Sequence, residues 1–161
     1  MPSDPADWPT LDELASEEDA LELTALTEDT AYRLGVAAVE AARERRLPIS
    51  IGLWRGEHQL FHSGLAGSTA DNDAWLQRKG RVVRRFERSS LYMGRLCHDE
   101  GTTFATKFKL PESEYAAAGG AVPLRVHGAG VVGWFGVSGL PQLADHQFVV
   151  EILTAHQQRS A

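Results

Sequence analysis

The stretch GGAVPLRVHGAGVVGWFGVSGLPQLADH, residues 119–146, carries the clearest structural pattern in this chain of 161 residues. Two runs rich in β-branched and aromatic residues, 121–127 and 131–138, are separated by Gly-Ala-Gly, which is typical of a β-hairpin. The residues that follow predict an amphipathic helix over about 142–158. The stretch therefore predicts a hairpin that leads directly into a helix.

A second hairpin is predicted upstream of this stretch. Apolar and small residues alternate over 49–54, and a return strand over 59–65 follows the turn Arg55-Gly56-Glu57. The two hairpins together predict one antiparallel sheet.

Helices are predicted on both sides of the upstream hairpin. Thr10-Leu-Asp-Glu13 has the spacing of a capping box that opens a short helix. A longer helix is expected from about 27 to 46, a third over 70–88 with Gly80 as its weak point, and a fourth ending near His98. Residues 99–118 are expected to form a loop with some helix. The order of elements favours an α/β (α+β) sandwich, with helices packed on an antiparallel sheet.

The composition of the chain is that of a globular protein and argues against a membrane-spanning or disulfide-rich one. The chain is 43% hydrophobic and 24% charged, and no apolar run approaches the ~20 residues that a membrane span needs. No secretory signal pattern is visible, so we expect a cytoplasmic protein that does not bind a membrane. The single cysteine, Cys97, excludes a disulfide framework or a multi-cysteine metal site within one chain and is expected to be a small core residue.

Negative charge is concentrated at the N-terminus. Residues 1–32 contain ten acidic side chains and no Lys or Arg, whereas the whole chain has a net charge of −6, so the remainder carries +4. We expect residues 1–26 to form an acidic helical arm and residues 27–161 to form a single α/β domain. The arm could pack on its own body, pack on a neighbouring subunit, or lie in solvent.

The stretch 119–146 resembles the signature segment of the haem-degrading domain family (HbpS/GlcG-like). The family has a glycine-rich strand entry, a Gly-Val-Val-Gly strand and a Val-Ser-Gly turn before the final helix, and Ser138 to His146 resembles a branch that has no established activity. The likeness runs from about residue 11 to 157. Further matches are Leu34-Gly35, Pro48, Leu60-Phe61-His62, Asp71 to Lys79 and Phe86 to Ser90.

The resemblance implies a profilin-like fold with an antiparallel sheet of about five strands, assembled into dimers or larger homo-oligomers. Only four strands follow from the pattern of residues. A fifth would lie within 99–110, where Thr103 to Lys109 alternates weakly, or would extend one of the hairpins.

The helix over 70–88 contains the first candidate site residues. At about 100° per residue, Trp75 and Phe86 fall on a core-facing stripe that also contains Asn72 and Lys79. A lysine among core residues needs a partner or an escape to water. Lys79 could therefore lie at the edge of the core with its ammonium in water, form an intersubunit salt bridge, or point into a pocket with Asp145 or with a ligand carboxylate.

The other face of this helix carries a basic stripe. Its arginines lie within a narrow arc and have no interleaved aromatic residues, so nucleic-acid binding is not expected in this acidic protein. A solvated face and a contact with a partner or subunit both stay open. The stripe consists of Arg78, Arg81, Arg84, Arg85 and Arg88.

Six histidines are scattered along the chain, and none belongs to a close-spaced set typical of a zinc or iron site. His146 follows Asp145 at the start of the last helix, where capping or packing is its plainest role. Haem needs only one axial ligand beside an apolar slot, so His62 and His146 are the candidate haem ligands.

Three functions are compatible with this sequence. The first is a homo-oligomeric protein that binds a small anionic or planar ligand and has no assigned catalytic residue. Its candidate site is Asn72, Trp75, Lys79, Ser138, Gly139, Asp145 and His146. The second is a protein that binds or degrades haem, and the third is an assembly module without a small ligand.

Overall fold

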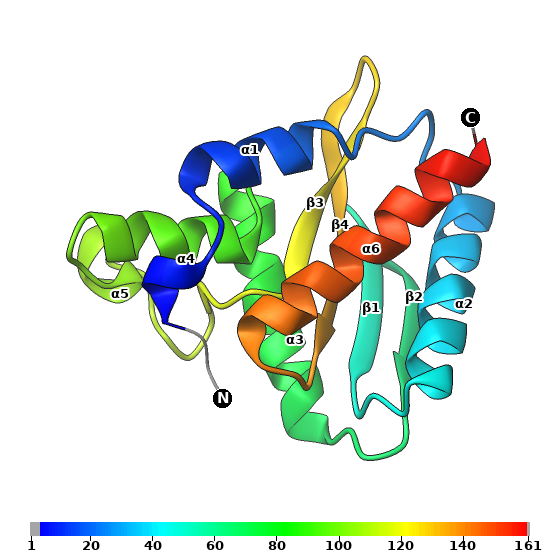
Figure 1. The fold of residues 1–161 in the computed structure, drawn as a ribbon, viewed down its shortest axis with the longest axis horizontal. Coiled ribbons are helices and arrows are strands. Elements are labelled where there is room, and N and C mark those ends of the chain that lie inside the picture. Colours follow the sequence, from blue (N-terminus) through cyan, green and yellow to red (C-terminus); the bar gives the residue numbers. More distant parts are fainter. Residues whose placement is uncertain (1–3, 161) are drawn as a thin grey trace.

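A computed structural model describes residues 4–160 of the chain. Figure 1 shows a central sheet with helices on both faces and a group of short helices at one end. The first three residues of the expected arm and the last residue of the expected domain lie outside the described range. The elements are the 3₁₀ helix η1 (Pro5–Asp7), α1 (Leu11–Asp19), α2 (Glu28–Glu44), β1 (Ser50–Arg55), β2 (His58–Gly64), α3 (Ala70–Phe86), α4 (Ser90–Asp99), α5 (Phe104–Phe108), β3 (Ala121–Val126), β4 (Gly130–Ser138) and α6 (Gln142–Ser160).

The sheet consists of two hairpins joined side by side. Its strand order is β2-β1-β4-β3 and every neighbouring pair is antiparallel, so the predicted α+β architecture and both hairpins are confirmed. The expected fifth strand is wrong, because the described sheet has four strands and Thr103 opens helix α5 instead. The Thr103 hydroxyl accepts from the Thr106 backbone amide, which caps the helix. Phe104 and Phe108 are four residues apart, and this spacing puts both side chains on one face in a strand and in a helix. The spacing therefore does not distinguish a strand from a helix here.

Helices α2 and α6 cover one face of the sheet (Figure 1). The inward-facing residues of the central strands, among them Ile51, Leu53, Phe135 and Val137, are fully buried there. At about 25 cal/mol per Å² of apolar area, this layer is the main source of folding free energy.

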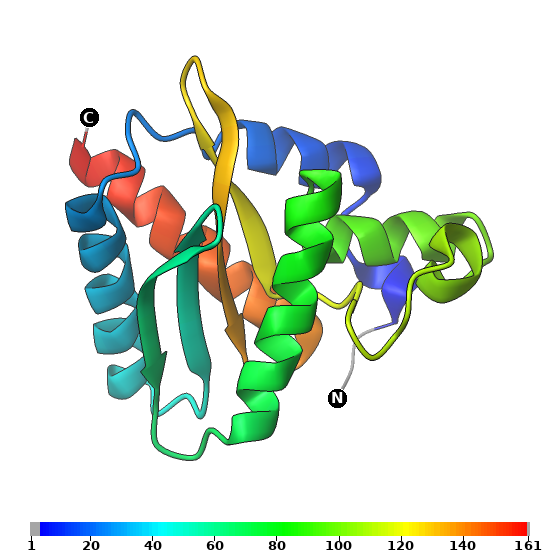
Figure 2. The same cartoon turned by 180° about the vertical axis from the view of Figure 1, so that it is seen from behind.

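Helix α3 covers the opposite face (Figure 2). Trp54 and Trp134 stack beneath it, with ring centroids 4.3 Å apart and planes inclined by 10°. Gly80 allows the helix to approach this stack, because a Cβ there would lie 2.1 Å from the Trp134 ring. The expected weak point of the helix is therefore its contact point with the sheet.

The two edges of the sheet differ. The backbone of Ala121 on β3 bonds to the Ser90 hydroxyl through both its amide and its carbonyl. Pro123 has no amide proton to offer, and the carbonyl of Arg125 accepts from the amide of Leu23 at 2.7 Å. The outer side of β2, in contrast, has no strand beside it among the described residues.

The acidic N-terminal segment packs on its own body. Leu14 is fully buried and clusters with Trp8 and Leu91. Glu18 is buried and accepts from the amide of Ser89 at 2.9 Å. Of the arrangements considered, the structure therefore has the arm on the same chain, whereas its division from the domain at residue 26 stays a prediction.

Within residues 4–160, no helix combines enough length with enough apolar character to cross a bilayer.

Candidate functional site

A buried ion pair joins α3 to the first turn of α6. The Lys79 ammonium lies 3.0 Å from the Asp145 carboxylate, and their side chains are only 5% and 1% exposed. Lys79 also donates to the carbonyl of Val137 at 3.4 Å. The structure therefore gives Lys79 the partner that a lysine on a core-facing stripe requires.

Asp145 also holds the turn between β4 and α6. Its carboxylate accepts from the amides of Gly139 at 3.3 Å and Leu140 at 3.0 Å. Gly139 has φ 150°, and a Cβ there would lie 2.3 Å from the carbonyl oxygen of Pro48, so glycine is required. The Ser-Gly-Leu-Pro turn is thus fixed by one carboxylate.

Burial opposes charge on both members of the pair. Desolvation raises the pKa of Asp145 above its ordinary value, and the nearby Lys79 and the two amides counteract this only in part. Desolvation likewise lowers the pKa of Lys79, against the attraction of Asp145. Each group therefore has less favourable surroundings for its charge than water provides.

A pocket of about 270 Å³ opens beside this pair, and we call it the ion-pair pocket. It lies between the N-terminal half of α3 and the turn that precedes α6. The structure brings together here six of the seven residues proposed for a ligand site. The lining residues are Asp71, Asn72, Trp75, Lys79, Ala118, Ser138, Gly139, Leu140, Gln142 and Asp145.

Asn72 and Trp75 have different surroundings within this pocket. The Asn72 side-chain oxygen accepts from the Thr69 amide at 2.8 Å and so caps α3. Trp75 is 38% exposed, so its expected place in the core is wrong. The buried residues of α3 are Leu76, Lys79, Gly80, Val82 and Val83. The Arg78 guanidinium lies 4.2 Å from the centroid of the Trp75 ring, a cation–π contact at the rim.

His146 points away from the ion-pair pocket. Its side chain is 1% exposed, and its Nε2 lies 2.7 Å from the Glu17 carboxylate on α1. Neighbouring residues on a helix diverge by about 100°, so Asp145 and His146 face different partners. The seventh proposed residue therefore does not join the other six.

His62 lies elsewhere as well. Its Nε2 is 2.8 Å from the Asp73 carboxylate on α3, and both side chains are partly exposed. Asp73 fixes the orientation of this ring, as a carboxylate does beside a metal-bound histidine. The two candidate haem ligands therefore do not share one site.

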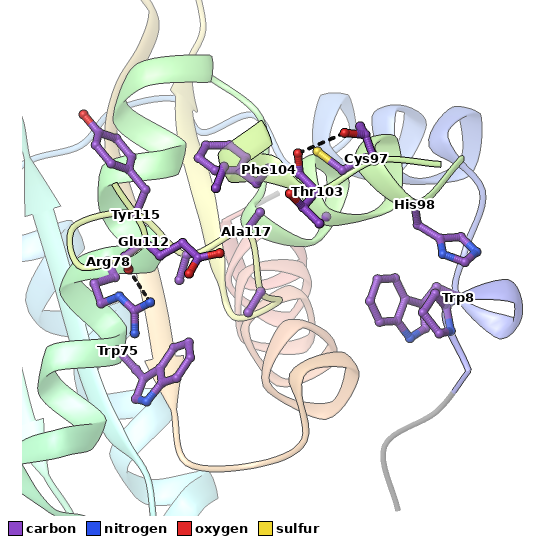
Figure 3. Close-up of a pocket in the computed structure, with 16 residues that line it drawn as sticks. Trp8, Trp75, Arg78, Cys97, His98, Thr103, Phe104, Glu112, Tyr115 and Ala117 are labelled. Atoms are coloured by element: carbon purple, nitrogen blue, oxygen red, sulfur yellow. Dashed lines mark hydrogen bonds between the residues drawn. The ribbon is translucent and has the colours of Figure 1, made fainter. Parts of the chain in front are cut away.

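A larger pocket of about 490 Å³ adjoins the first and shares Trp75 and Ala118 with it. Figure 3 shows Trp75 and Arg78 projecting into it from α3, with Trp8 on the opposite wall. Phe104 and Tyr115 add aromatic side chains, and Arg78 donates to the carbonyl of Glu112. We call it the aromatic pocket.

Sequence reasoning missed the aromatic pocket. Its walls come from η1, α3, α4, α5 and the segment before β3, which lie far apart in the sequence. The aromatic residues at 104, 108 and 115 were a signal that residues 99–118 are more than a loop. They do not indicate which helices they meet.

The part of the chain that the structure describes contains no group of three or more His, Cys, Asp or Glu side chains arranged to hold a metal ion. Cys97 lines the aromatic pocket but is buried, and this burial raises the pKa of its thiol. A high pKa makes a thiolate nucleophile scarce at neutral pH.

Comparison with known proteins identifies the family of this chain. The model of the family "Haem degrading protein HbpS-like" matches residues 26–154. A UPF0303 protein of Streptomyces avermitilis is 50% identical over 145 residues, which cover 90% of this chain and 89% of the relative. The arm before residue 26 lies outside the match to the family model.

Solved structures share the fold. The crystal structure of the Ybr137w protein superposes with a TM-score of 0.87 at 34% identity and covers 94% of this chain and 90% of that one. The crystal structure of a PduOC:heme complex has a TM-score of 0.68 at 16% identity, with coverages of 82% and 94%, a likeness of fold alone. With most of its length matched by the family model, the chain belongs to the HbpS-like haem-degrading protein family.

Proposed function

We propose that this protein binds a small ligand with a planar part and an anionic group in the ion-pair pocket, and that it acts as a homo-oligomer. The observation that carries the proposal is the buried Lys79–Asp145 pair at the wall of that pocket. A charged pair with desolvated members is unusual in a core and is frequent at functional sites.

Lys79 supplies the anion-binding group. An ammonium has three protons to donate, and two of them have partners, on Asp145 and Val137. The third is available to a ligand carboxylate that enters the pocket. In these largely desolvated surroundings the attraction of an entering carboxylate to Lys79 is stronger than in water, and the proposal requires that it exceed the repulsion from Asp145, which lines the same pocket.

Trp75 supplies a surface for a planar group. Its ring is exposed at the junction of the ion-pair pocket and the aromatic pocket. A flat ligand can stack on an indole while its anionic end reaches Lys79.

The open edge of β2 supports self-association, because unpaired strand edges readily pair with a second copy. We place this function in the cytoplasm. The single, free and buried Cys97 is compatible with a reducing compartment.

Haem is the second candidate ligand, and it rests on His62. The ring is partly exposed and is oriented through Nε2 by Asp73, which leaves Nδ1 for iron. The fold is shared with a protein solved as a heme complex. His146 is a poorer candidate because it is buried against Glu17.

Trp75→Ala tests the first candidate, with Tyr32→Ala, an exposed aromatic residue on α2, as the matched control. Thermal unfolding is followed with a panel of aromatic carboxylates and haemin. A ligand at a hundred times its Kd stabilises by about 2.7 kcal/mol, which such scans detect. Tyr32→Ala should keep this stabilisation and Trp75→Ala should lose most of it. An unchanged response in Trp75→Ala contradicts binding at Trp75, and no stabilisation by any compound contradicts the proposal and favours a pure assembly protein.

Haem binding is tested separately by titration with haemin. A Soret band that is lost in His62→Ala supports axial ligation by this residue. His127→Ala is the control, because His127 is also paired with a carboxylate, Glu22, and is exposed. A Soret band that persists in His62→Ala contradicts ligation by His62.

A further inference from the structure

A second hollow, of about 320 Å³, lies on the outer side of α3. Its walls are Arg81, Arg84, Arg85 and Tyr115, and we call it the arginine hollow. The three arginines follow the helical spacing i, i+3, i+4, which brings their side chains to neighbouring positions on one face. Three guanidinium groups therefore surround one small volume.

These arginines lack firm carboxylate partners. Arg84 reaches Glu57 only at 3.4 Å, and the Glu57 side chain is 89% exposed. Arg81 donates to the backbone carbonyl of Glu114, and Arg85 lies 6.0 Å from the centroid of the Phe86 ring. Within the described residues, no ion pair links Arg81 or Arg85 to a carboxylate.

Six arginines elsewhere in the chain are paired with carboxylates. Carboxylates of the same chain lie beside Arg33, Arg45, Arg55, Arg88, Arg95 and Arg125. Of the glutamates in the neighbouring segments, Glu57, Glu87, Glu112 and Glu114, only Glu57 forms an ion pair with an arginine of the hollow in the part of the chain that the structure describes. The guanidinium groups of Arg81 and Arg85 are therefore without a carboxylate partner among the described residues, which favours binding of an external anion.

Tyr115 gives the hollow its far wall. The residue belongs to the segment before β3, and its ring stacks near Phe104 at 6.2 Å between centroids. In Figure 3 its hydroxyl points away from the aromatic pocket. Guanidinium groups from one side and a phenol from the other can both donate hydrogen bonds to one anion.

We propose that the arginine hollow binds the phosphate groups of a small phosphorylated molecule, with a diphosphate as the best fit. Guanidinium groups match phosphate oxygens in geometry and form charge-assisted hydrogen bonds with them. The two outer arginines of the stripe are already engaged, Arg88 by Glu18 and Arg78 by the Glu112 carbonyl. Three guanidinium groups around one hollow, two of them without a carboxylate partner among the described residues, suit a compact anion better than an extended nucleic-acid backbone.

Isothermal titration with inorganic pyrophosphate and with ADP tests this proposal. We expect saturable binding that weakens as salt is added. Arg85→Gln should raise the Kd about tenfold, as expected for one lost charged hydrogen bond, and Arg81→Gln/Arg85→Gln should raise it further. Tighter binding of ADP than of pyrophosphate assigns the site to a nucleotide, and equal binding assigns it to the free diphosphate.

The matched control is Arg43→Gln, which removes the same charge from an exposed position in the last turn of α2. It should leave the Kd unchanged. Equal weakening by Arg43→Gln and Arg85→Gln, no saturable binding to the wild type, or displacement of pyrophosphate by random duplex DNA would overturn the proposal.

All these arginines are exposed, so far-UV circular dichroism should show native folding in each variant. Stabilisation by ligands of the ion-pair pocket should persist in Arg85→Gln, which keeps the two proposals separable.

Discussion

The Lys79 ammonium and the Asp145 carboxylate meet at 3.0 Å although 66 residues separate them in the chain. The contact ties the core-facing side of α3 to the first turn of α6 and, through Asp145, to the turn after β4. Its energetic role follows from burial, because an ion that loses its partner here cannot be solvated.

Lys79→Met should therefore destabilise the protein by about 3–5 kcal/mol, the usual cost of breaking a buried pair. The measurement is urea unfolding at neutral pH. Lys79→Met/Asp145→Asn should recover part of the loss, because no charge is buried and the one amide oxygen of Asn can still accept from either Gly139 or Leu140, which bond to different oxygens of Asp145. If the double variant is as unstable as Lys79→Met, uncompensated charge is not the cause.

Gly80→Ala should destabilise by about 1–3 kcal/mol, although alanine is the better helix former. The new methyl group would overlap the Trp134 ring and force α3 or the Trp54–Trp134 stack to move. Urea unfolding gives the free energy, and near-UV circular dichroism reports the stacked indoles. Gln77→Ala, at an exposed position of the same helix, should be neutral or slightly stabilising.

Glu18→Leu should cost about 2–3 kcal/mol, because the buried Ser89 amide loses its acceptor and Arg88 loses a partner. Glu18→Gln retains an oxygen in the same place and should cost less. Chemical denaturation compares the two. Similar losses in both variants would show that charge on Glu18, and not its role as an acceptor, is what matters.

The pair between Arg45 on α2 and Glu151 on α6 predicts a pH dependence. The hydrogen bond from Arg45 lowers the pKa of Glu151 below its ordinary value of 4.5. A carboxyl with a lowered pKa in the folded state stabilises the protein above its unfolded pKa, and this contribution is lost as pH falls through the folded pKa.

Arg45→Gln should therefore lower the free energy of unfolding at neutral pH by less than about 1 kcal/mol, since both side chains are half exposed. The difference from the wild type should vanish in acid, below the lowered pKa of Glu151. Unfolding curves over a pH series measure it. A difference that grows as pH falls would have the wrong sign for this pair.

The fold could be predicted largely from local patterns in the sequence. Both hairpins and the long helices lie within one or two residues of the predicted bounds, because alternation, turn glycines and capping residues act over short distances. The segment 104–108 could not be assigned in this way. Its two phenylalanines pack their rings against Phe86, and that tertiary contact selects helix over strand.

The candidate site could be predicted in part. A lysine on a core-facing stripe needs a partner, and Asp145 lies in the first turn of the last predicted helix, so the pairing was one of the arrangements that could be foreseen. The exposure of Trp75 could not be predicted, because it depends on where Trp134 of the sheet meets the helix, at Gly80. Periodicity gives the face of a helix that is buried, but not the exact line of contact.

The blocked edge of β3 limits how copies of this chain can associate. A hydroxyl, a proline and the backbone of Leu23 already occupy the positions where another strand would bond. Strand pairing through β2 alone uses the open edge of each of two copies and then has nowhere to continue. The sheet can thus be doubled but cannot grow into a filament, so any larger assembly must be built through the helices.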